Sequence, residues 1–346
     1  MPAGQPRAVP RVMTLEEIRA AVDPPALIDD VAAAFVAYSA GRAVVPPVGH
    51  LRFDAEPPAD GEHKAGYPAG DVHVKSGYVL GGDVYVVKVA SGFPALGAAG
   101  RSPNDGAIVV FERATGAVRA VLLDEGMLTD LRTAAAGAVA ARHLAPRLTR
   151  VGVYGTGVQA RLQALFLEHV TPCRAIGVWG RRPEAAERLA AELSARGWDA
   201  EVYADPAALA GAADLLVTTT ARPASEPPLF PAGSARPGTH VTALGADAPG
   251  KRELDPALLA RADVVVVDSL SQCADHGELR HALDAGVLPG PAGHAARPVV
   301  ELGAVVAGRA PGRTGADQIT VADLTGVAVQ DVAAARHVAA RVGRSG

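Results

Sequence analysis

The residues with the clearest chemical potential form a glycine-rich turn. A short apolar strand, Val151–Tyr154, leads into this turn, and a helical pattern follows it. Gly155 permits a tight turn, Gly157 lets the backbone approach a pyrophosphate, and Ala160 allows the helix to pack closely on the strand. This context of strand, turn and helix predicts a dinucleotide site, with contacts from Gly155, Thr156, Gly157, Val158 and Gln159.

The region around this turn predicts the sheet that positions it. Apolar runs at residues 175–179, 214–218, 239–243 and 263–268 alternate with helical stretches. This alternation is typical of a Rossmann-type, doubly wound parallel sheet in an α/β protein. Ligands of such sheets lie beyond the carboxyl ends of the strands, so we expect Thr218, Thr219 and Asp268 near the cofactor. Each threonine is also an ordinary β-branched residue at a strand end.

The end of the second strand of this region bears on the choice of cofactor. NAD-specific sites usually place an acidic residue there for the ribose hydroxyls, but this chain has Gly180, Arg181 and Arg182. A glycine and two arginines leave room and positive charge for a 2′-phosphate. We therefore expect NADP or NAD, with NADP favoured, although the arginines are also compatible with a solvated helix start.

Two lysines stand out in the preceding part of the chain, residues 1–130, which has the pattern of an α+β domain. Strand candidates at 71–80 and 83–90 flank Gly81-Gly82, and a two-residue turn there sets Lys75 directly opposite Lys88. Like charges in that arrangement destabilise a sheet. Either both ammonium groups point to solvent, or they flank an anion such as a substrate carboxylate.

A second candidate for anion binding is Arg132. Thr129 is placed to cap an alanine-rich helix that continues to about Leu144, which puts Arg132 in the first helical turn. A cation is disfavoured there because the helix dipole is positive at that end. Arg132 thus either shares an anion with the free N–H groups or points outward into solvent.

Composition restricts the class of protein. The 346 residues are 49% hydrophobic with a formal net charge of −4, which fits two cores and gives no basic excess for nucleic acid. The two cysteines lack disulfide or metal spacing, no run is long enough to span a membrane, and the N-terminus carries no apolar targeting segment. We expect a cytoplasmic enzyme with no metal, no membrane and no nucleic-acid partner.

The chain resembles the ornithine cyclodeaminase/mu-crystallin family over nearly its whole length. The resemblance rests on residues 87–89, 128–135, 155–160, 245–254 and 319–331, and a finer similarity to ectoine-utilisation proteins on 46–51, 73–78 and 88–93. It implies a substrate-binding and dimerisation domain, residues 1–130 completed by 320–346, and a Rossmann domain, residues 131–319. It also implies a homodimer and a C-terminal helix that returns to the first domain.

The resemblance also implies roles for individual residues. Lys88 and Arg132 hold the carboxylate of an amino acid or cyclic imino acid, and Asp247 lies near the reacting nitrogen. A fixed carboxylate there stabilises the cationic iminium or relays a proton, although Asp247 alone would equally suit a loop cap. Val48 replaces a carboxylate-binding arginine usual in ornithine-type members, a place that Arg52, Lys75 or His50 would fill.

The resulting hypothesis is an NAD(P)-dependent enzyme acting on a C–N bond, with Asp247 and Lys88 as catalytic residues. Its leading version is cyclodeamination, in which the α-amine is oxidised, the distal amine displaces ammonia, and the cyclic imine is reduced again. A ketimine reductase or amino-acid dehydrogenase would use the same residues. A non-catalytic, mu-crystallin-like ligand-binding protein is the alternative of another class.

Overall fold

The computed structural model describes residues 9–55, 68–93, 95–96, 102, 104–288 and 299–342. The chain divides into two compact units. The first comprises residues 1–23, 41–129 and 331–346, and the second comprises residues 24–40 and 130–330.

The first unit is built on a mostly antiparallel sheet. Its strand order is β1-β7-β6-β5-β4-β2, with β3 paired to β4, and β1 pairs with β7 in parallel. The strands are β1 (Arg11–Met13), β2 (Ala43–Val44), β3 (Gly49–Phe53), β4 (Gly70–Val79), β5 (Val84–Gly92), β6 (Asn104–Glu112) and β7 (Val118–Leu122).

Local signals fix the ends of these elements. Helix α1 (Leu15–Ala21) begins with the capping box of Thr14 and Glu17, in which each side chain accepts from the other residue's backbone N–H. The turn between β4 and β5 uses Gly81 at φ +83°, a conformation that side chains disfavour. The strand pairing across this turn is the one that the two-residue loop predicts.

A helix from the C-terminus completes the first unit. Helix α12 is Ala328–Val342, and a Cβ at Gly77 of β4 would lie 3.7 Å from Val332 Cγ2, so the helix packs closely on the sheet. Most of this helix therefore belongs to the first unit.

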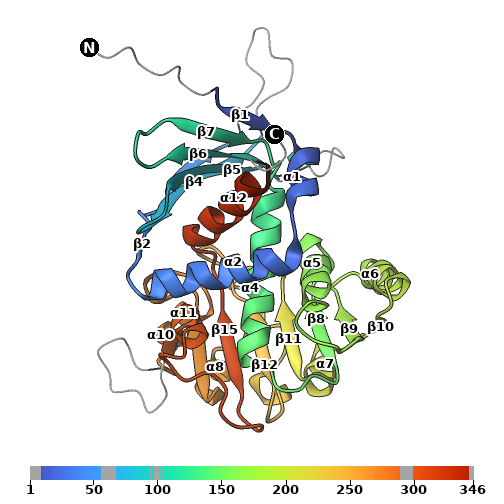
Figure 1. The fold of residues 1–346 in the computed structure, drawn as a ribbon. Coiled ribbons are helices and arrows are strands. Elements are labelled where there is room, and N and C mark those ends of the chain that lie inside the picture. The colour runs from blue at the N-terminus through green and yellow to red at the C-terminus, as the bar shows by residue number, and fades with distance from the viewer. Residues whose placement is uncertain are drawn as a thin grey trace, which may run out of the picture. The chain divides into compact units, whose positions relative to one another are not determined.

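The second unit contains an eight-stranded parallel sheet, confirming the predicted fold class. The strand order is β10-β9-β8-β11-β12-β15-β13-β14. In Figure 1, β8, β11, β12 and β15 run side by side. The strands are β8 (Val151–Tyr154), β9 (Ala175–Trp179), β10 (Asp199–Val202), β11 (Leu215–Thr218), β12 (His240–Ala243), β13 (Val264–Val267), β14 (Val299–Glu301) and β15 (Thr320–Asp323).

Helices connect these strands, as parallel pairing requires. The connecting helices are α5 (Val158–Leu167), α6 (Pro183–Ala195), α7 (Pro206–Ala212), α8 (Pro256–Arg261), α9 (Leu270–Asp275), α10 (Glu278–Asp284) and α11 (Leu302–Val306), whereas α2 (Pro24–Ser39) and α4 (Met127–Leu144) precede the first strand of this sheet in the chain. A 3-10 turn, Ala232–Ser234, lies between β11 and β12. Strands β8, β11, β12 and β13 are entirely buried, which explains their continuous apolar runs.

Two segments fall in the second unit rather than in the predicted first domain. Helix α2 packs against α11 so closely that a Cβ at Gly303 would overlap the carbonyl of Phe35. Strand β15 pairs with both β12 and β13. The expected division at residues 130 and 319 therefore changes, because these contacts tie both segments to the parallel sheet.

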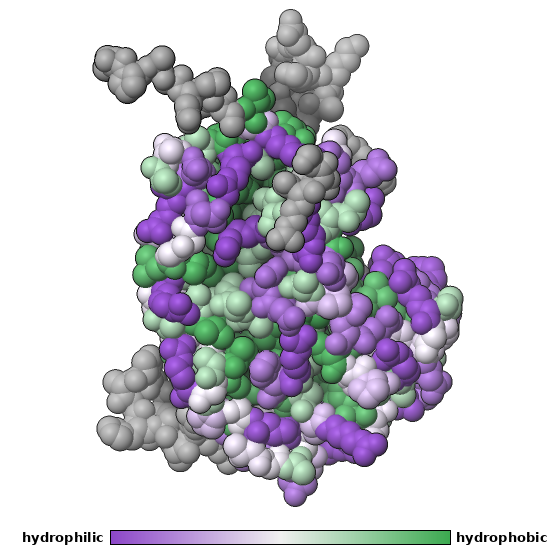
Figure 2. Space-filling view, in the orientation of Figure 1, coloured by the Kyte–Doolittle hydropathy of each residue, from purple (hydrophilic) through white to green (hydrophobic). Residues whose placement is uncertain are grey.

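In the part of the chain that the structure describes, no helix has the length and apolar character needed to cross a lipid bilayer. On the face drawn in Figure 2, hydrophilic and hydrophobic residues are interspersed.

Candidate functional site

The glycine-rich turn lies between β8 and α5, next to the point where the strand order reverses. Gly155 has φ +120°, and a Cβ there would come within 2.4 Å of Thr219 Oγ1. Gly157 precedes α5 without a side-chain cap, and a Cβ there would meet no protein atom within 4 Å. The N-terminus of α5 therefore faces open space, which suits a pyrophosphate.

The neighbouring residues of the turn have distinct surroundings. Val158 is 51% exposed, so the first residue of α5 is accessible to solvent. Gln159 donates from Nε2 to the Oδ1 of Asp130 at 3.2 Å, which ties α5 to α4. Ala160 is fully buried, consistent with close packing of the helix on the sheet.

The end of β9 adjoins this turn. A Cβ at Gly180 would lie 2.5 Å from the Cγ2 of Thr156, so a side chain there would displace that of Thr156. Arg181 and Arg182 are both exposed, and Arg182 precedes α6. Arg181 lies 3.7 Å from Glu226 with 80% of its side chain exposed. Both arginines are thus accessible to a phosphate, and their role in cofactor choice stays a prediction.

The threonines after β11 are held by a buried carboxylate. Thr218 donates from Oγ1 to Glu253 at 2.6 Å, and Thr220 does the same to the other carboxylate oxygen. The backbone N–H of Gly245 also donates to Glu253, at 2.8 Å. Burial raises the pKa of Glu253, while these hydrogen bonds lower it. Glu253, which sequence reasoning missed, thus joins the carboxyl ends of β11 and β12.

Two of the expected cofactor contacts are buried and form hydrogen bonds within the chain. Thr218 is completely buried and its hydroxyl is used by Glu253, so its side chain supports the strand end instead. Asp268 is also completely buried, and it accepts hydrogen bonds from the Gly326 N–H at 2.6 Å and the Thr325 hydroxyl at 3.2 Å. Thr219 is only partly buried and donates to the carbonyl of Tyr154 at 2.9 Å, linking β11 to β8.

The predicted opposition of Lys75 and Lys88 is present in the structure. The two residues are register partners across β4 and β5. Lys88 is only 3% exposed, and its ammonium group donates to Asp331 at 2.8 Å and to Thr129 at 2.9 Å. The anion beside Lys88 is therefore a carboxylate of this chain, which offsets the repulsion between the lysines.

Arg132 lies deeper in its helix than expected. Helix α4 begins at Met127, and Asp124 accepts from the Leu128 N–H at 2.9 Å, so Thr129 is not the cap. Arg132 falls in the second helical turn, where the argument from the helix dipole no longer applies. Its guanidinium group is buried and donates to Gln330 at 2.7 Å.

Asp247 follows β12 on an exposed loop. Its carboxylate forms an ion pair with Lys251 at 2.6 Å, and 53% of the Asp247 side chain is exposed. This lysine was not predicted, although a spacing of four residues is a recognisable signal. The ammonium group of Lys251 thus occupies the position beside Asp247 where we expected the amine of a substrate.

His50 and Arg52 lie on β3, which is exposed throughout. The registers of β3, β4 and β5 place both on the same sheet face as Lys75 and Lys88. His73 on β4 is the register partner of His50 and was missed as a candidate. Burial lowers the pKa of His73, although nearby Asp71 opposes this effect.

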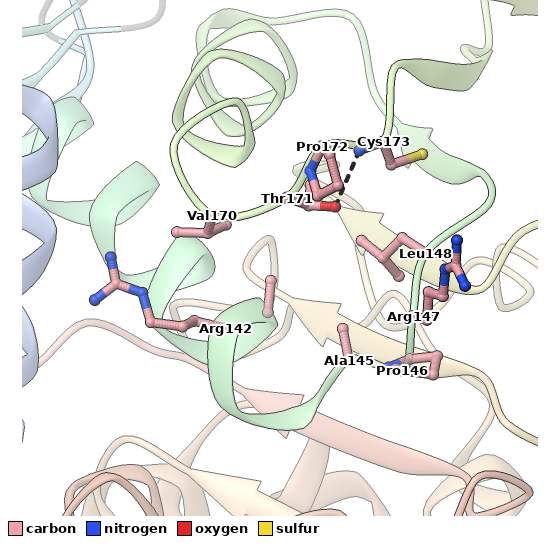
Figure 3. Close-up of a pocket in the computed structure, with 10 residues that line it drawn as sticks. Arg142, Ala145, Pro146, Arg147, Leu148, Val170, Thr171, Pro172 and Cys173 are labelled. Atoms are coloured by element: carbon pink, nitrogen blue, oxygen red, sulfur yellow. Dashed lines mark hydrogen bonds between the residues drawn. The ribbon is translucent and has the colours of Figure 1, made fainter.

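Figure 3 shows a pocket of about 340 Å³ in the second unit. It is lined by residues 141, 142, 145–148 and 170–173, which precede β8 and β9. It therefore lies at the amino ends of these strands, whereas ligands of doubly wound sheets bind at the carboxyl ends. Arg142 in its lining is ion-paired with Asp29 at 2.7 Å. None of its lining residues is a candidate cofactor-binding or substrate-binding residue.

Comparisons with known proteins agree with this architecture. A candidate dehydrogenase of Rhizobium meliloti is 41% identical over 337 residues, covering 96% of this chain and 95% of that protein. An archaeal alanine dehydrogenase dimer with bound NAD superimposes with a TM-score of 0.84 at 30% identity, covering 96% of both chains. The iminosuccinate reductase of Paracoccus denitrificans in complex with NAD⁺ superimposes with a TM-score of 0.81 at 31% identity, again covering 96% of both chains.

The family assignment rests on a match over nearly the whole chain rather than on one motif. The sequence profile of one family matches residues 8–346, which includes both units and the glycine-rich turn. The predicted resemblance is thereby confirmed: the chain belongs to the ornithine cyclodeaminase/mu-crystallin family.

Proposed function

We propose that this protein is an NAD(P)(H)-dependent enzyme that interconverts a small α-amino acid and its imine. The observation that carries the cofactor half is the open N-terminus of α5, where Gly157 leaves space for a pyrophosphate at the switch point of the sheet. When bound, the nicotinamide supplies the hydride acceptor or donor. The substrate half draws on the relatives, since alanine and iminosuccinate both carry a carboxylate beside the reacting carbon.

Lys88 and Arg132 are the residues we propose for that carboxylate. Both are buried cations held in fixed positions, Lys88 by Asp331 and Thr129 and Arg132 by Gln330. Fixed donors bind an anion with a smaller loss of side-chain entropy than flexible surface lysines do. Lys75, directly opposite Lys88, is a further donor for the substrate in this proposal.

Asp247 is the residue we propose to act at the substrate nitrogen. Oxidation of the amine creates a cationic iminium, which a nearby carboxylate stabilises. Its exposed position allows it to exchange Lys251 for the substrate, because a surface ion pair is worth only about 0–1 kcal/mol. In the reverse direction the same carboxylate keeps a protonated imine in place for reduction.

We favour simple oxidation or reduction over cyclodeamination. A diamino acid needs an acceptor for its distal ammonium group, yet the sheet face beside Lys88 carries Lys75, Arg52 and two histidines. Asp71 is the acid on the described strands β3 to β5 of this face, and it contacts both histidines. Cyclodeamination, as in family members named for it, is the second candidate, and Asp247 would serve it equally well.

The test is a reaction panel with purified protein. Pyruvate or oxaloacetate with ammonia and NADH or NADPH should give stoichiometric loss of nicotinamide absorbance. Ornithine, lysine and 2,4-diaminobutyrate with catalytic NAD(P)⁺ should release no ammonia. Ammonia release without net NAD(P)H would reverse our order of the two candidates.

Asp247→Asn separates an enzyme from a ligand-binding protein. We expect this variant to keep its affinity for NAD(P)H and to lose turnover by roughly 100-fold or more, the usual range for a general acid–base group. Lys251→Gln is the matched control, and it should retain turnover. Wild-type protein that binds cofactor without any turnover across the panel would favour the non-catalytic alternative.

A further inference from the structure

Three potential metal ligands converge on one face of the first sheet. His50 and His73 are register partners across β3 and β4, and Asp71 lies two residues before His73 on the same face. The Oδ2 atom of Asp71 lies 3.4 Å from the Nε2 of His73 and 3.8 Å from the Nε2 of His50. The two imidazole rings stack with centroids 4.6 Å apart.

The contact between His73 and Asp71 is a hydrogen bond of 3.4 Å, and the contact between His50 and Asp71 is longer still. An N–H···O bond normally spans about 2.7–3.2 Å, so both contacts to Asp71 are long. A tetrahedral Zn²⁺ ion with bonds of about 2.0–2.1 Å holds its ligand atoms about 3.3 Å apart. One ligand atom from each of the three residues lies within 4.8 Å of the other two. Side-chain rotations that bring these atoms closer together would complete the geometry.

We propose that His50, Asp71 and His73 form a binding site for a divalent transition-metal ion, with Zn²⁺ the best match. Imidazole nitrogen and carboxylate oxygen are ligands that Zn²⁺ accepts, and three protein ligands leave a fourth position for water or an anion. The three side chains are 38–44% exposed, so an ion has access. Lys75 on the same face opposes cation binding, which sets the affinity below that of buried structural zinc sites.

The site rests on strand pairing rather than on a loop. Cross-strand partners have Cβ atoms about 4.5–5.5 Å apart, which holds the two histidines in position before any ion binds. Asp71 is fixed in the same way, because it is the register partner of Arg52 on β3. The proposal does not depend on the enzymatic function, and either can fail without the other.

The experiment is a titration of the full-length, chelator-treated protein with Co²⁺, followed by the visible absorption of tetrahedral cobalt. We expect one Co²⁺ per chain and displacement by Zn²⁺. His73→Ala and His50→Ala should each weaken binding at least 100-fold. His276→Ala is the matched control, because His276 also lies beside a carboxylate, Asp275 at 3.2 Å, in a different unit.

Each outcome decides the proposal. A wild-type titration without tetrahedral bands, or bands that persist in His73→Ala, would overturn it. His73→Gln serves as a second, more conservative variant, and circular dichroism with thermal melting shows that each variant is folded. Loss of cobalt binding with a wild-type melting temperature supports the metal site.

Discussion

At the scale of single residues, the pair of Lys88 and Asp331 combines a predicted residue with an unpredicted one. Both side chains are almost fully buried, so neither charge is well solvated. A buried pair contributes little over an apolar replacement, but a lone buried charge is costly. The pair therefore constrains substitutions whether or not Lys88 binds substrate.

Replacing Lys88 alone should destabilise the protein. Lys88→Met leaves Asp331 without its cation, and we expect a loss of about 3–5 kcal/mol in the free energy of unfolding, measured with urea. The double variant Lys88→Met, Asp331→Leu should recover a large part of this loss. Arg280→Met is the control, because loss of its exposed pair with Asp284 should change the free energy of unfolding far less. A double variant no more stable than Lys88→Met would contradict this account.

Arg181 and Arg182 decide the use of NADPH if they bind its 2′-phosphate. A hydrogen bond to a charged group is worth about 1.5–3 kcal/mol, so each alanine variant should raise the Kd for NADPH roughly tenfold or more. The Kd for NADH should change little. Arg188→Ala, an exposed arginine further along α6, is the control. Equal effects on the Kd values for NADPH and NADH would show that neither arginine binds the 2′-phosphate.

At the scale of elements, the turn between β8 and α5 contains two glycines with different roles. Gly155 is required by the fold, because its φ is positive and Thr219 occupies the space of a Cβ. Gly157 has no such neighbour within 4 Å. A side chain at Gly157 would therefore extend into the space that the cofactor needs.

A substitution at Gly157 should weaken cofactor binding, whereas a substitution at Gly155 should lower stability. Gly157→Val should leave the melting temperature nearly unchanged and raise the Kd for NADH more than tenfold, because the pyrophosphate can no longer approach. Gly155→Ala should lower the free energy of unfolding by about 1–3 kcal/mol through backbone strain. Calorimetry and NADH fluorescence measure the two effects. Normal NADH affinity in Gly157→Val would place the cofactor elsewhere.

At the scale of the whole molecule, buried carboxylates link the carboxyl ends of the sheet. Asp268 follows β13, Asp323 ends the neighbouring strand β15, and Asp323 accepts from the Leu279 N–H at 2.9 Å. Burial raises the pKa of Asp323 from 3.8 to about 7, and it raises that of Glu278 well above its ordinary value. Stability should therefore depend on pH.

The sign of this dependence follows from proton uptake. Between pH 4 and pH 7 the folded protein retains a proton on Asp323 that the unfolded chain has lost, so stability falls as pH rises. Asp323→Asn removes this titration while keeping an oxygen acceptor. From pH 5 to pH 8 wild-type should lose roughly 1–3 kcal/mol more than the variant, at about 1.4 kcal/mol per pKa unit. Asp284→Asn is the surface control, and parallel pH profiles for wild-type and Asp323→Asn would refute the argument.

Sequence by itself determined the features that depend on neighbouring residues. The hairpin register at Gly81 and the strand, turn and helix around Gly155 appear where their local patterns place them. These signals work because a few backbone conformations and a short hydrogen-bonding distance specify each of them. The alternation of apolar runs and helices likewise determined the parallel sheet.

Only the tertiary structure decided which distant residues meet. Asp331 lies 243 positions from Lys88, and Glu253 lies 35 positions from Thr218. Strand β15 is inserted between β12 and β13, although it follows both in the chain. His50 and His73 face each other through strand pairing, a relation that no ligand spacing reveals. Such partners are selected by the packing of whole elements, because burial and long-range pairing are not encoded in any one segment.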